Sequence, residues 1–433
     1  MVAIGTVRSL KGIVLTVEFF ENQPPVDELL YITIEKSQVP LLLHSYKDET
    51  IARCINLTDN KKIVKGMKVS ASGKPLEIPV GDNAVGHIFN ALGLATDVDE
   101  QPEAEMRAVN DTGRASAYTT GEAQIMETGI KVLDFFTPFV KGRKIGIIGG
   151  AGVGKTVLMM ELIHNVGKQD SGLAMFTGIG ERVREGHELY ETLKERKLLG
   201  NTVMYFAQMN ENPALRAMVG ISSTRLAEYY RDEEKKDILF FVDNIYRYVQ
   251  ARNELSTILD EIPSEGGYQA TIFSDIKALQ DRLSSNENGS IPSVQTIYVP
   301  ADDLSDPAVQ MISHELDSVV VLSRKIAEQG IRPAVDIIRT KSSLLTPAIV
   351  GDRHYQLVER VQILMQKYES LKNIIAIIGE NELSPIDRSD YAKAKKLIEF
   401  FSQELHVTED LTGNPGQYAT LEETLKGVEE ILV

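Results

Sequence analysis

The pattern of hydrophobic and polar positions divides the chain into three stretches with different predicted structures. Residues 1–76 hold short runs rich in β-branched residues, separated by glycine and charged residues, which is typical of short strands that close into a barrel. In residues 77–350, apolar runs of strand length alternate with helical segments, as in a parallel sheet covered by helices. In residues 351–433, apolar residues recur at helical spacing, which predicts a helical domain.

We therefore expect an α/β core with an N-terminal β-barrel of the six-stranded type and a C-terminal helical bundle. Five barrel strands stand out by composition, at residues 5–10, 12–19, 29–35, 50–57 and 66–73. The core strands are expected at residues 144–149, 172–178, 202–208, 237–243 and 294–300. The charged run from Asp232 to Lys236 is expected to be a solvated loop.

A phosphate-binding motif lies between a predicted strand and a predicted helix. The pattern G-x-x-x-x-G-K-[ST] is met by GGAGVGKT, from Gly149 to Thr156. Its glycines allow backbone N–H groups to turn toward phosphate oxygens at the start of a helix. Lys155 would reach the β- and γ-phosphates, and the Thr156 hydroxyl would bind Mg²⁺. The nucleotide-binding segment is Gly149, Gly150, Ala151, Gly152, Val153, Gly154, Lys155, Thr156 and Val157.

Two acidic residues follow apolar runs further along the chain. Asp243 ends the run from Ile238 to Val242. Taken alone, it fits a simple strand-ending aspartate equally well, but downstream of a phosphate-binding motif such an aspartate holds the Mg²⁺ shell, usually through water. Glu181, in GIGER, falls where the strand after the phosphate-binding helix should end. It is a candidate for activating a water beside a γ-phosphate. From the pattern alone, this stretch reads equally well as a charged loop that leads into a helix.

Composition excludes several classes of function. The formal net charge of −16, from 46 basic and 62 acidic residues, argues against broad nucleic-acid binding. No apolar run reaches the ~18 residues of a membrane span, and the start of the chain lacks a signal-peptide core. The single cysteine, Cys54, excludes an internal disulfide. The seven histidines show no pair at metal-ligand spacing, so no zinc or iron site is expected.

An ordered set of motifs extends over nearly the whole chain. These include IPVGDNAVGHIFNALG, GGAGVGKTVLMMELIHN, GERVREGHELY, FFVDNIYRYVQA, EIPSEGGYQATI, YVPADDLSDPA and GIRPAVD. In this order, the chain resembles the catalytic beta subunit of F-type rotary ATP synthases. The resemblance implies a P-loop, RecA-like nucleotide-binding core and Mg²⁺-dependent hydrolysis or synthesis of ATP, with ADP as the other nucleotide.

The resemblance assigns catalytic roles to four residues. Lys155 matches a phosphate contact, and Glu181 matches the carboxylate that orients the attacking water. Arg182 matches the neighbour of that carboxylate on the γ-phosphate side, and Arg247 matches a phosphate-contacting arginine. An arginine finger would come from a partner subunit, which places the site at an interface.

The resemblance also assigns the metal site. At the base pocket, however, the chain departs from the family. Besides Thr156, the residues Glu185 and Asp243 match acids of the Mg²⁺ water shell. The family lines the adenine pocket with aromatic rings, whereas this chain has Arg332, Leu405 and Leu411 at those places. Loss of ring stacking, worth roughly 0.5–1.5 kcal/mol per pair, predicts weaker discrimination between ATP and GTP.

Partners are implied in the same way. The family forms a ring that alternates with a non-catalytic alpha-like subunit around a central rotor shaft. Asp303, Ser305 and Asp306 match a loop that touches the shaft, and the stretch from Asn381 to Asp387 matches a second contact. The family carries five acids in that stretch, and here NELSPID keeps two. Such a complex would lie at the cytoplasmic face of the cell membrane, with membrane contact only through other subunits.

Several alternatives remain at this point. One is a dedicated F-type-like ATPase motor without a proton channel, similar to the additional ATPases of mycoplasmas. Another is a nucleotide-binding structural subunit that no longer hydrolyses ATP. An alpha-like subunit would carry glutamine in place of Glu181, and a ring helicase would need a basic channel. A protein-export or vacuolar ATPase would lack YVPADDLSDP as it stands here.

Overall fold

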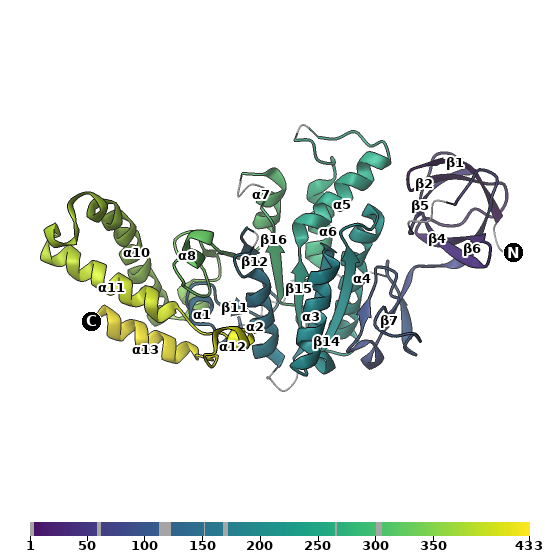
Figure 1. Ribbon diagram of the computed structural model, residues 1–433. Helices are drawn as coiled ribbons and strands as arrows, with labels where there is room; N and C mark the ends of the chain where they lie inside the picture. The colour runs from purple at the N-terminus through teal and green to yellow at the C-terminus, as the bar shows by residue number, and fades with distance from the viewer. Residues whose placement is uncertain are drawn as a thin grey trace. The chain divides into compact units, whose positions relative to one another are not determined.

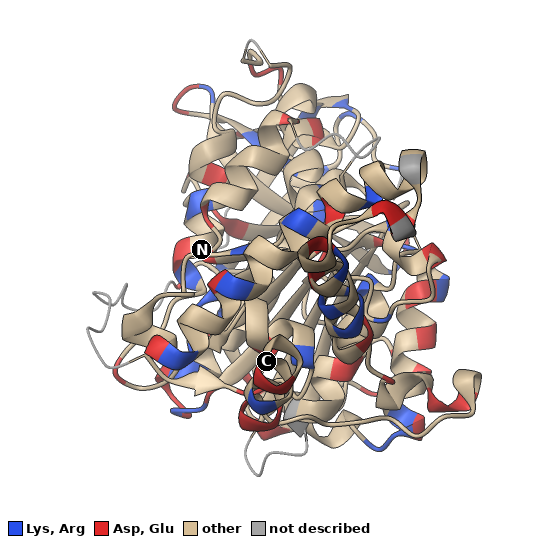
Figure 2. Ribbon diagram, turned by 90° about the vertical axis from the view of Figure 1, so that its left-hand side faces the viewer, with Lys and Arg blue, Asp and Glu red and all other residues tan. Residues whose placement is uncertain are grey.

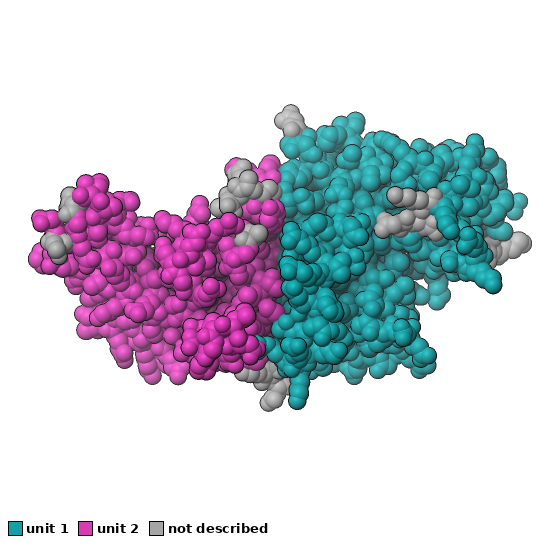
Figure 3. Space-filling view, viewed as in Figure 1, with its two compact units in different colours: residues 1–117, 173–289 teal, residues 118–172, 290–433 magenta. Residues whose placement is uncertain are grey.

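The computed structural model describes residues 4–58, 62–111, 123–150, 152–167, 172–264, 266–299 and 305–433. The chain forms two units, each assembled from two separate segments of sequence (Figure 3). Unit 1 comprises residues 1–117 and 173–289, and unit 2 comprises residues 118–172 and 290–433. Within the described residues, no helix combines the length and the apolar character that crossing a membrane requires.

Unit 1 begins with a closed barrel, as the alternating pattern predicted (Figure 1). Its strands follow the order β1-β2-β5-β4-β3-β6. They are β1 (Ile4–Lys11), β2 (Val14–Phe19), β3 (Glu28–Ile34), β4 (Ser37–Tyr46), β5 (Ile51–Asn56) and β6 (Lys68–Pro75). Alternate side chains point inward and form one apolar core that includes Val7, Leu15 and Leu30.

Strand β4 is the one barrel strand that the composition did not single out. Its sequence SQVPLLLHSY contains Pro40, and proline cannot donate a hydrogen bond to a neighbouring strand. In the barrel, Pro40 lies opposite Tyr31 of β3, and its carbonyl oxygen accepts a hydrogen bond from the Leu57 N–H at 3.1 Å. The proline is therefore tolerated because only its carbonyl is used.

The rest of unit 1 is a set of parallel strands covered by helices. The strands, in the order β15-β13-β14-β8, are β15 (Ile238–Asp243), β13 (Leu173–Glu181), β14 (Thr202–Gln208) and β8 (Ile88–Phe89). A separate antiparallel pair joins β7 (Glu77–Val80) and β9 (Glu105–Ala108). The helices are α3 (Val183–Glu195), α4 (Pro213–Asp232), α5 (Ile245–Ile258) and α6 (Ile272–Arg282), with short 3-10 turns η1 (Asp82–Ala84) and η2 (Leu199–Asn201).

Unit 2 contains a second set of parallel strands. Strand β12 (Lys144–Ile148) is buried and pairs in parallel with β16 (Ser293–Ile297) and β17 (Ser318–Val321). Strand β18 (Lys341–Ser342) pairs antiparallel with β17, and β10 (Ile125–Met126) pairs with β11 (Phe139–Val140). The associated helices are α1 (Lys131–Phe136), α2 (Lys155–Gly167), α7 (Pro307–His314), α8 (Arg324–Glu328) and α9 (Pro347–Val350).

The end of unit 2 is helical, as predicted. Its elements are α10 (Asp352–Ile378), η4 (Glu380–Glu382), α11 (Pro385–Phe401), η5 (His406–Thr408), α12 (Glu409–Thr412) and α13 (Leu421–Leu432). The long helices α10 and α11 pack through the stacked rings of Tyr368 and Tyr391, whose centroids are 5.0 Å apart. Arg353 of α10 donates hydrogen bonds to Glu422 and Glu429 of α13. The observed barrel, parallel strands and helices confirm the expected fold class.

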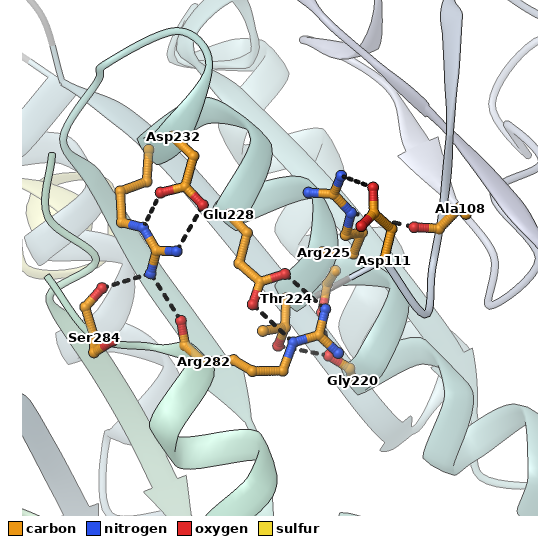
Figure 4. A network of polar contacts seen from close by, with 11 residues as sticks. Ala108, Asp111, Gly220, Thr224, Arg225, Glu228, Asp232, Arg282 and Ser284 are labelled. Carbon is orange, nitrogen blue, oxygen red and sulfur yellow. Dashed lines mark hydrogen bonds and ion pairs between the residues drawn. The ribbon is translucent and has the colours of Figure 1, made fainter. Parts of the chain in front are cut away.

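Positively and negatively charged residues are distributed along the helices (Figure 2). Some of them are buried in unit 1, where helix α4 carries a polar network (Figure 4). The buried carboxylate of Glu228 accepts two hydrogen bonds from the guanidinium of Arg282, at 2.8 and 2.7 Å. Arg231 binds both carboxylate oxygens of Asp232 and the carbonyl oxygens of Arg282 and Ser284.

Asp232 therefore does not behave as part of a solvated run. Burial raises the pKa of its carboxyl, but hydrogen bonds from Arg231 and Asn286 outweigh burial and hold the pKa below the usual range. The expectation fails at Asp232 because this residue still belongs to α4 and one of its partners, Asn286, lies 54 residues away in the sequence, whereas residues 233–235 are exposed and lie outside the helix.

Candidate active site

The phosphate-binding motif forms a loop between β12 and α2, in the strand–loop–helix context that the motif requires. Gly152 and Gly154 have φ angles of +74° and +98°, which side-chain-bearing residues rarely adopt. At Gly149 the constraint is different, because a Cβ atom would lie 2.8 Å from the Val153 side chain and 3.0 Å from the Cβ of Leu322. The glycines therefore permit both the turn and the close packing of the loop.

Lys155 and Thr156 open helix α2. The Lys155 ammonium donates hydrogen bonds to the carbonyl oxygens of Gly149 and Gly150, at 2.8 and 2.6 Å. It is therefore held over the loop, where it would meet a bound phosphate. Thr156 is exposed on the first turn of the helix. Ala151, which we also assigned to the loop, lies outside the described residues.

Glu181 ends strand β13, as the sequence predicted, and its side chain is only 6% exposed. The register between β13 and β14 shifts between Ile179 and Glu181, and the intervening Gly180 has a φ of +63°. Such a bulge changes the direction in which the following side chain points. The strand end thus presents a buried carboxylate out of the regular alternation.

Two neighbours of Glu181 come from β15 and α5. Asp243 ends β15 and lies opposite Gly178 in the register of β13 and β15. The next residue, Asn244, caps α5 and accepts a hydrogen bond from the Arg247 N–H at 3.2 Å. The guanidinium of Arg247 donates to the Gly180 carbonyl oxygen, and its Nε lies 3.3 Å from a carboxylate oxygen of Glu181. The bulge therefore changes the direction of the Glu181 side chain and also provides the carbonyl oxygen to which Arg247 donates.

Helix α3 adds two more charged residues. Arg182 is the N-cap of α3 and lies 3.5 Å from Glu185 in the first turn. The carboxyl of Glu185 forms a hydrogen bond with that of Glu181. Burial and the charge of Asp243 raise the pKa of Glu181 to about 8, although Arg247 opposes the shift. The hydrogen bond with Glu185 also raises this pKa, because two carboxyls can form such a bond only when one of them is protonated.

The residues assigned to the base pocket have different surroundings. Leu405 is buried, at 4% exposure, whereas Leu411 of α12 is 87% exposed. Arg332 has an exposed side chain, and its carbonyl oxygen accepts a hydrogen bond from the Gln403 N–H at 2.7 Å. Leu405 and Arg332 thus belong to two segments that are directly joined. Leu411 lies on the surface of a short helix.

The residues assigned to the rotor contacts have structural partners of their own. Asp306 is the N-cap of α7 and accepts hydrogen bonds from the N–H groups of Ala308 and Val309. Ser305 is described, whereas Asp303 lies outside the described residues. In the stretch from Asn381 to Asp387, the last residue pairs with Lys367 at 2.7 Å.

The structure thus brings the predicted residues together in two groups. Unit 1 gathers the charged residues Glu181, Arg182, Glu185, Asp243 and Arg247, and unit 2 holds the phosphate loop with Lys155 and Thr156. Sequence reasoning missed the bulge at Gly180, although a glycine inside a strand pattern is a known signal for one. It also missed Glu161 of α2, which reads in the sequence as an ordinary helix position.

The comparison with known families bears on both groups. Residues 129–342 match the ATP synthase alpha/beta family, nucleotide-binding domain. Residues 345–430 match the C-terminal domain of V and A type ATP synthase. The first match includes the phosphate loop as well as the acid cluster, and the second includes the helical end of unit 2. Since the two matches follow each other along the chain, the chain contains the nucleotide-binding domain of the ATP synthase alpha/beta family followed by a C-terminal domain similar to that of V and A type ATP synthase.

Proposed function

We propose that the chain is the catalytic subunit of a rotary ATPase or ATP synthase of the F type. The observation that carries the proposal is the buried carboxylate of Glu181, with Arg247 and Asp243 beside it. Buried acids whose pKa is shifted toward neutrality beside a specific charged partner cluster at catalytic sites, because such a pKa suits proton transfer. The matched segment 129–342 contains this cluster and the phosphate loop, which supports assigning both to one reaction.

The phosphate loop would bind the nucleotide. Backbone N–H groups at the start of α2 and the Lys155 ammonium provide positive charge for the β- and γ-phosphates. The Thr156 hydroxyl and the carboxylates of Glu185 and Asp243 are hard oxygen donors, the kind that Mg²⁺ prefers, directly or through water. When bound, Mg²⁺ would neutralise charge on the phosphates. The exposure of Thr156 fits this role.

Glu181 would hold the water. In the hydrolytic direction, the oxygen of the water bonds to the γ-phosphorus while the bond to the bridging oxygen breaks and ADP leaves. The carboxylate of Glu181 accepts a proton from the water and later releases it to the phosphate product or to solvent. Arg247 and Lys155 offset charge on the phosphoryl oxygens. Such a reaction depends on positioning and electrostatics rather than on covalent steps. A pKa of about 8 suits the task, because a general base works best when its pKa is near the working pH.

The proposal includes a partner. An alpha-like subunit would contribute an arginine finger to each site and alternate with this chain around a rotor shaft. We propose that the shaft is contacted by the loop with Ser305 and Asp306 and by the stretch 381–387, at the cytoplasmic face of a membrane. Because a finger supplied in trans is worth roughly 10³–10⁵ in rate, ATP hydrolysis should be far slower with the purified chain than with its complex. Equal rates per site would contradict the proposal.

A second candidate is a subunit of a V- or A-type rotary complex, which the match of residues 345–430 favours. Affinity purification through this chain, followed by mass spectrometry, separates the candidates. An alpha-like partner, a shaft and a proton or sodium channel of F type support an ATP synthase. The same partner and shaft without a channel support a dedicated motor. Subunits of V or A type support the second candidate. If the purified complex retains nucleotide but shows no ATP turnover, the chain is a structural subunit.

A further inference from the structure

Glu161 is a fully buried acid on the helix that follows the phosphate loop. It lies on α2, fewer than two turns after Lys155, and its side chain is 0% exposed. Both of its carboxylate oxygens have partners. One lies 2.9 Å from Nδ1 of His406, and the other accepts a hydrogen bond from the Val407 N–H at 3.0 Å. The partners are about 245 residues away in sequence and lie in the same unit.

The segment that Glu161 holds is the one that carries the proposed base-binding leucines. Leu405 directly precedes His406, and Leu411 follows on the next short helix. The segment is also fixed from other sides, since Gln403 binds the carbonyl oxygen of Arg332 through its N–H, and its side chain donates to the carbonyl oxygens of Gly129 and Gln417. The contact with α2 runs through Glu161 and through the ring of His164, whose centroid is 5.0 Å from that of His406.

Attachment of a loop to a helix through a buried carboxylate requires desolvation of its charge, which is unfavourable. Leu158 and Leu162, its neighbours on α2, are buried too, and an apolar residue would pack among them without desolvating a charge. The carboxylate, however, fixes the orientation of the segment relative to the helix. Two hydrogen bonds to adjacent residues of one segment fix its height and its rotation against the helix, which apolar packing does less strictly.

We propose that Glu161 and His406 are positioning residues that set the spacing between the phosphate loop and the base-binding segment. This inference rests on the proposed function. In a nucleoside triphosphate, the base and the phosphates are separated by a fixed covalent length. A protein that binds both the base and the phosphates must hold its base-binding segment and its phosphate loop at the matching separation. The pair thereby contributes to the recognition of nucleotides without touching either end of the ligand.

The test compares a ligand that has a base with one that lacks it. Dissociation constants of the full-length chain are measured for Mg²⁺-ATP and for Mg²⁺-tripolyphosphate, with three variants. Glu161→Gln keeps an acceptor for Val407 and weakens the bond to His406. His406→Phe removes the same bond and keeps a ring next to His164. Glu430→Gln, an exposed acid on α13, is the matched control.

We expect Glu161→Gln and His406→Phe each to weaken ATP binding about tenfold, the effect of one lost charge-assisted hydrogen bond. Binding of tripolyphosphate should change less than twofold, and the control should change neither. The double variant should be no weaker than the single ones, because both remove one interaction. If Glu161→Gln does not fold, His406→Phe alone makes the same comparison.

Two results would overturn the inference. An equal loss for both ligands would mean that the pair supports the fold of the phosphate loop in general. No loss for either ligand would mean that the spacing does not depend on the pair. Failure of the proposed function looks different. A complex that binds ATP without turnover would overturn the catalytic role and leave this comparison of ligands valid, whereas an unmodified chain that binds neither ATP nor tripolyphosphate would overturn both.

Discussion

Arg247 of α5 holds its guanidinium Nε 3.3 Å from the carboxylate of Glu181 at the end of β13. It also donates to the carbonyl oxygen of Gly180, in the bulge that precedes this acid. The arginine therefore stabilises the geometry of the strand end more than it stabilises the charge, because burial and Asp243 still raise the pKa of Glu181 to about 8. An acid held in this way is ready to ionise when the surroundings become more positive.

Replacement of Glu181 by glutamine tests its assigned role. The amide keeps the size of the side chain and removes the charge that orients the water. We expect turnover to fall by roughly 10²–10⁴, the usual contribution of a positioned acid or base, while nucleotide affinity is retained. Steady-state ATP hydrolysis by the complex and equilibrium nucleotide binding measure the two effects.

Glu188→Gln is the matched control, since Glu188 lies exposed on α3 and pairs with Arg184 at the surface. It should leave turnover within about twofold, as expected for a solvated pair. If Glu181→Gln and Glu188→Gln were equally active, the catalytic role of Glu181 would be wrong.

The raised pKa of Glu181 also predicts how stability depends on pH. In the folded chain the carboxyl has a pKa of about 8, compared with an ordinary value of 4.5. Between these values the folded state binds more protons than the unfolded state, so the free energy of unfolding falls as the pH rises. The contribution of one group is at most about 1.4 kcal/mol per pH unit. Glu181→Gln removes this contribution.

The melting temperatures of both proteins at pH 5, 7 and 9 check this expectation. The variant should gain stability relative to the unmodified chain as the pH rises from 5 to 9, and the curves should lie closest at pH 5. A difference that stays constant with pH would show that Glu181 does not carry a raised pKa in the folded state.

The prediction of the fold from the sequence succeeded where one local pattern decides the structure. The strand, loop and helix around Gly149 form as expected, because each has a strong local signal. The ends of β13 and β15 were also located, since a charged residue follows an apolar run in each. Strand β4 was missed because Pro40 weakens its local propensity, and the closed barrel overrides that propensity through pairing on both sides.

Contacts between distant residues could not be predicted in this way. Nothing near Glu161 in the sequence indicates His406, because the two meet only when the C-terminal segment packs on α2. Likewise, the raised pKa of Glu181 depends on Asp243, which comes from another strand. The roles that come from family resemblance named Glu181 and Asp243, but they gave no reason for the charge state of either residue.

The base pocket can be tested by returning a ring to it. Leu411 is 87% exposed, so phenylalanine can replace it without disturbing a packed core. If this position faces the base, Leu411→Phe should strengthen ATP binding by roughly 2- to 10-fold, the value of one aromatic pair. Nucleotide dissociation constants for ATP and GTP measure the change.

Leu405→Phe is the instructive contrast, because Leu405 is buried and a larger side chain there must displace its neighbours. Overpacking of this kind typically costs about 1–3 kcal/mol of stability. We therefore expect a lower melting temperature for Leu405→Phe and an unchanged one for Leu411→Phe. No change in affinity for Leu411→Phe would place this residue away from the base.

Removal of one partner from the buried pair of Glu228 and Arg282 should strongly destabilise unit 1. Glu228 is 2% exposed, and Arg282 binds both of its carboxylate oxygens (Figure 4). Arg282→Met would leave the Glu228 charge buried without this partner, which costs about 3–5 kcal/mol in comparable cases. Asp281→Asn, on the same helix, breaks an exposed pair with Lys277 and should cost less than about 1 kcal/mol. Urea unfolding, followed by circular dichroism, measures both differences.

Because the pair joins α4 to the end of α6, whereas the acid cluster belongs to β13, β15, α3 and α5, Arg282→Met should lower stability and leave the turnover of the folded complex nearly unchanged. If Arg282→Met and Asp281→Asn lowered the free energy of unfolding by similar amounts, the Glu228 carboxylate would have to be hydrated once Arg282 is removed, and the prediction would be wrong.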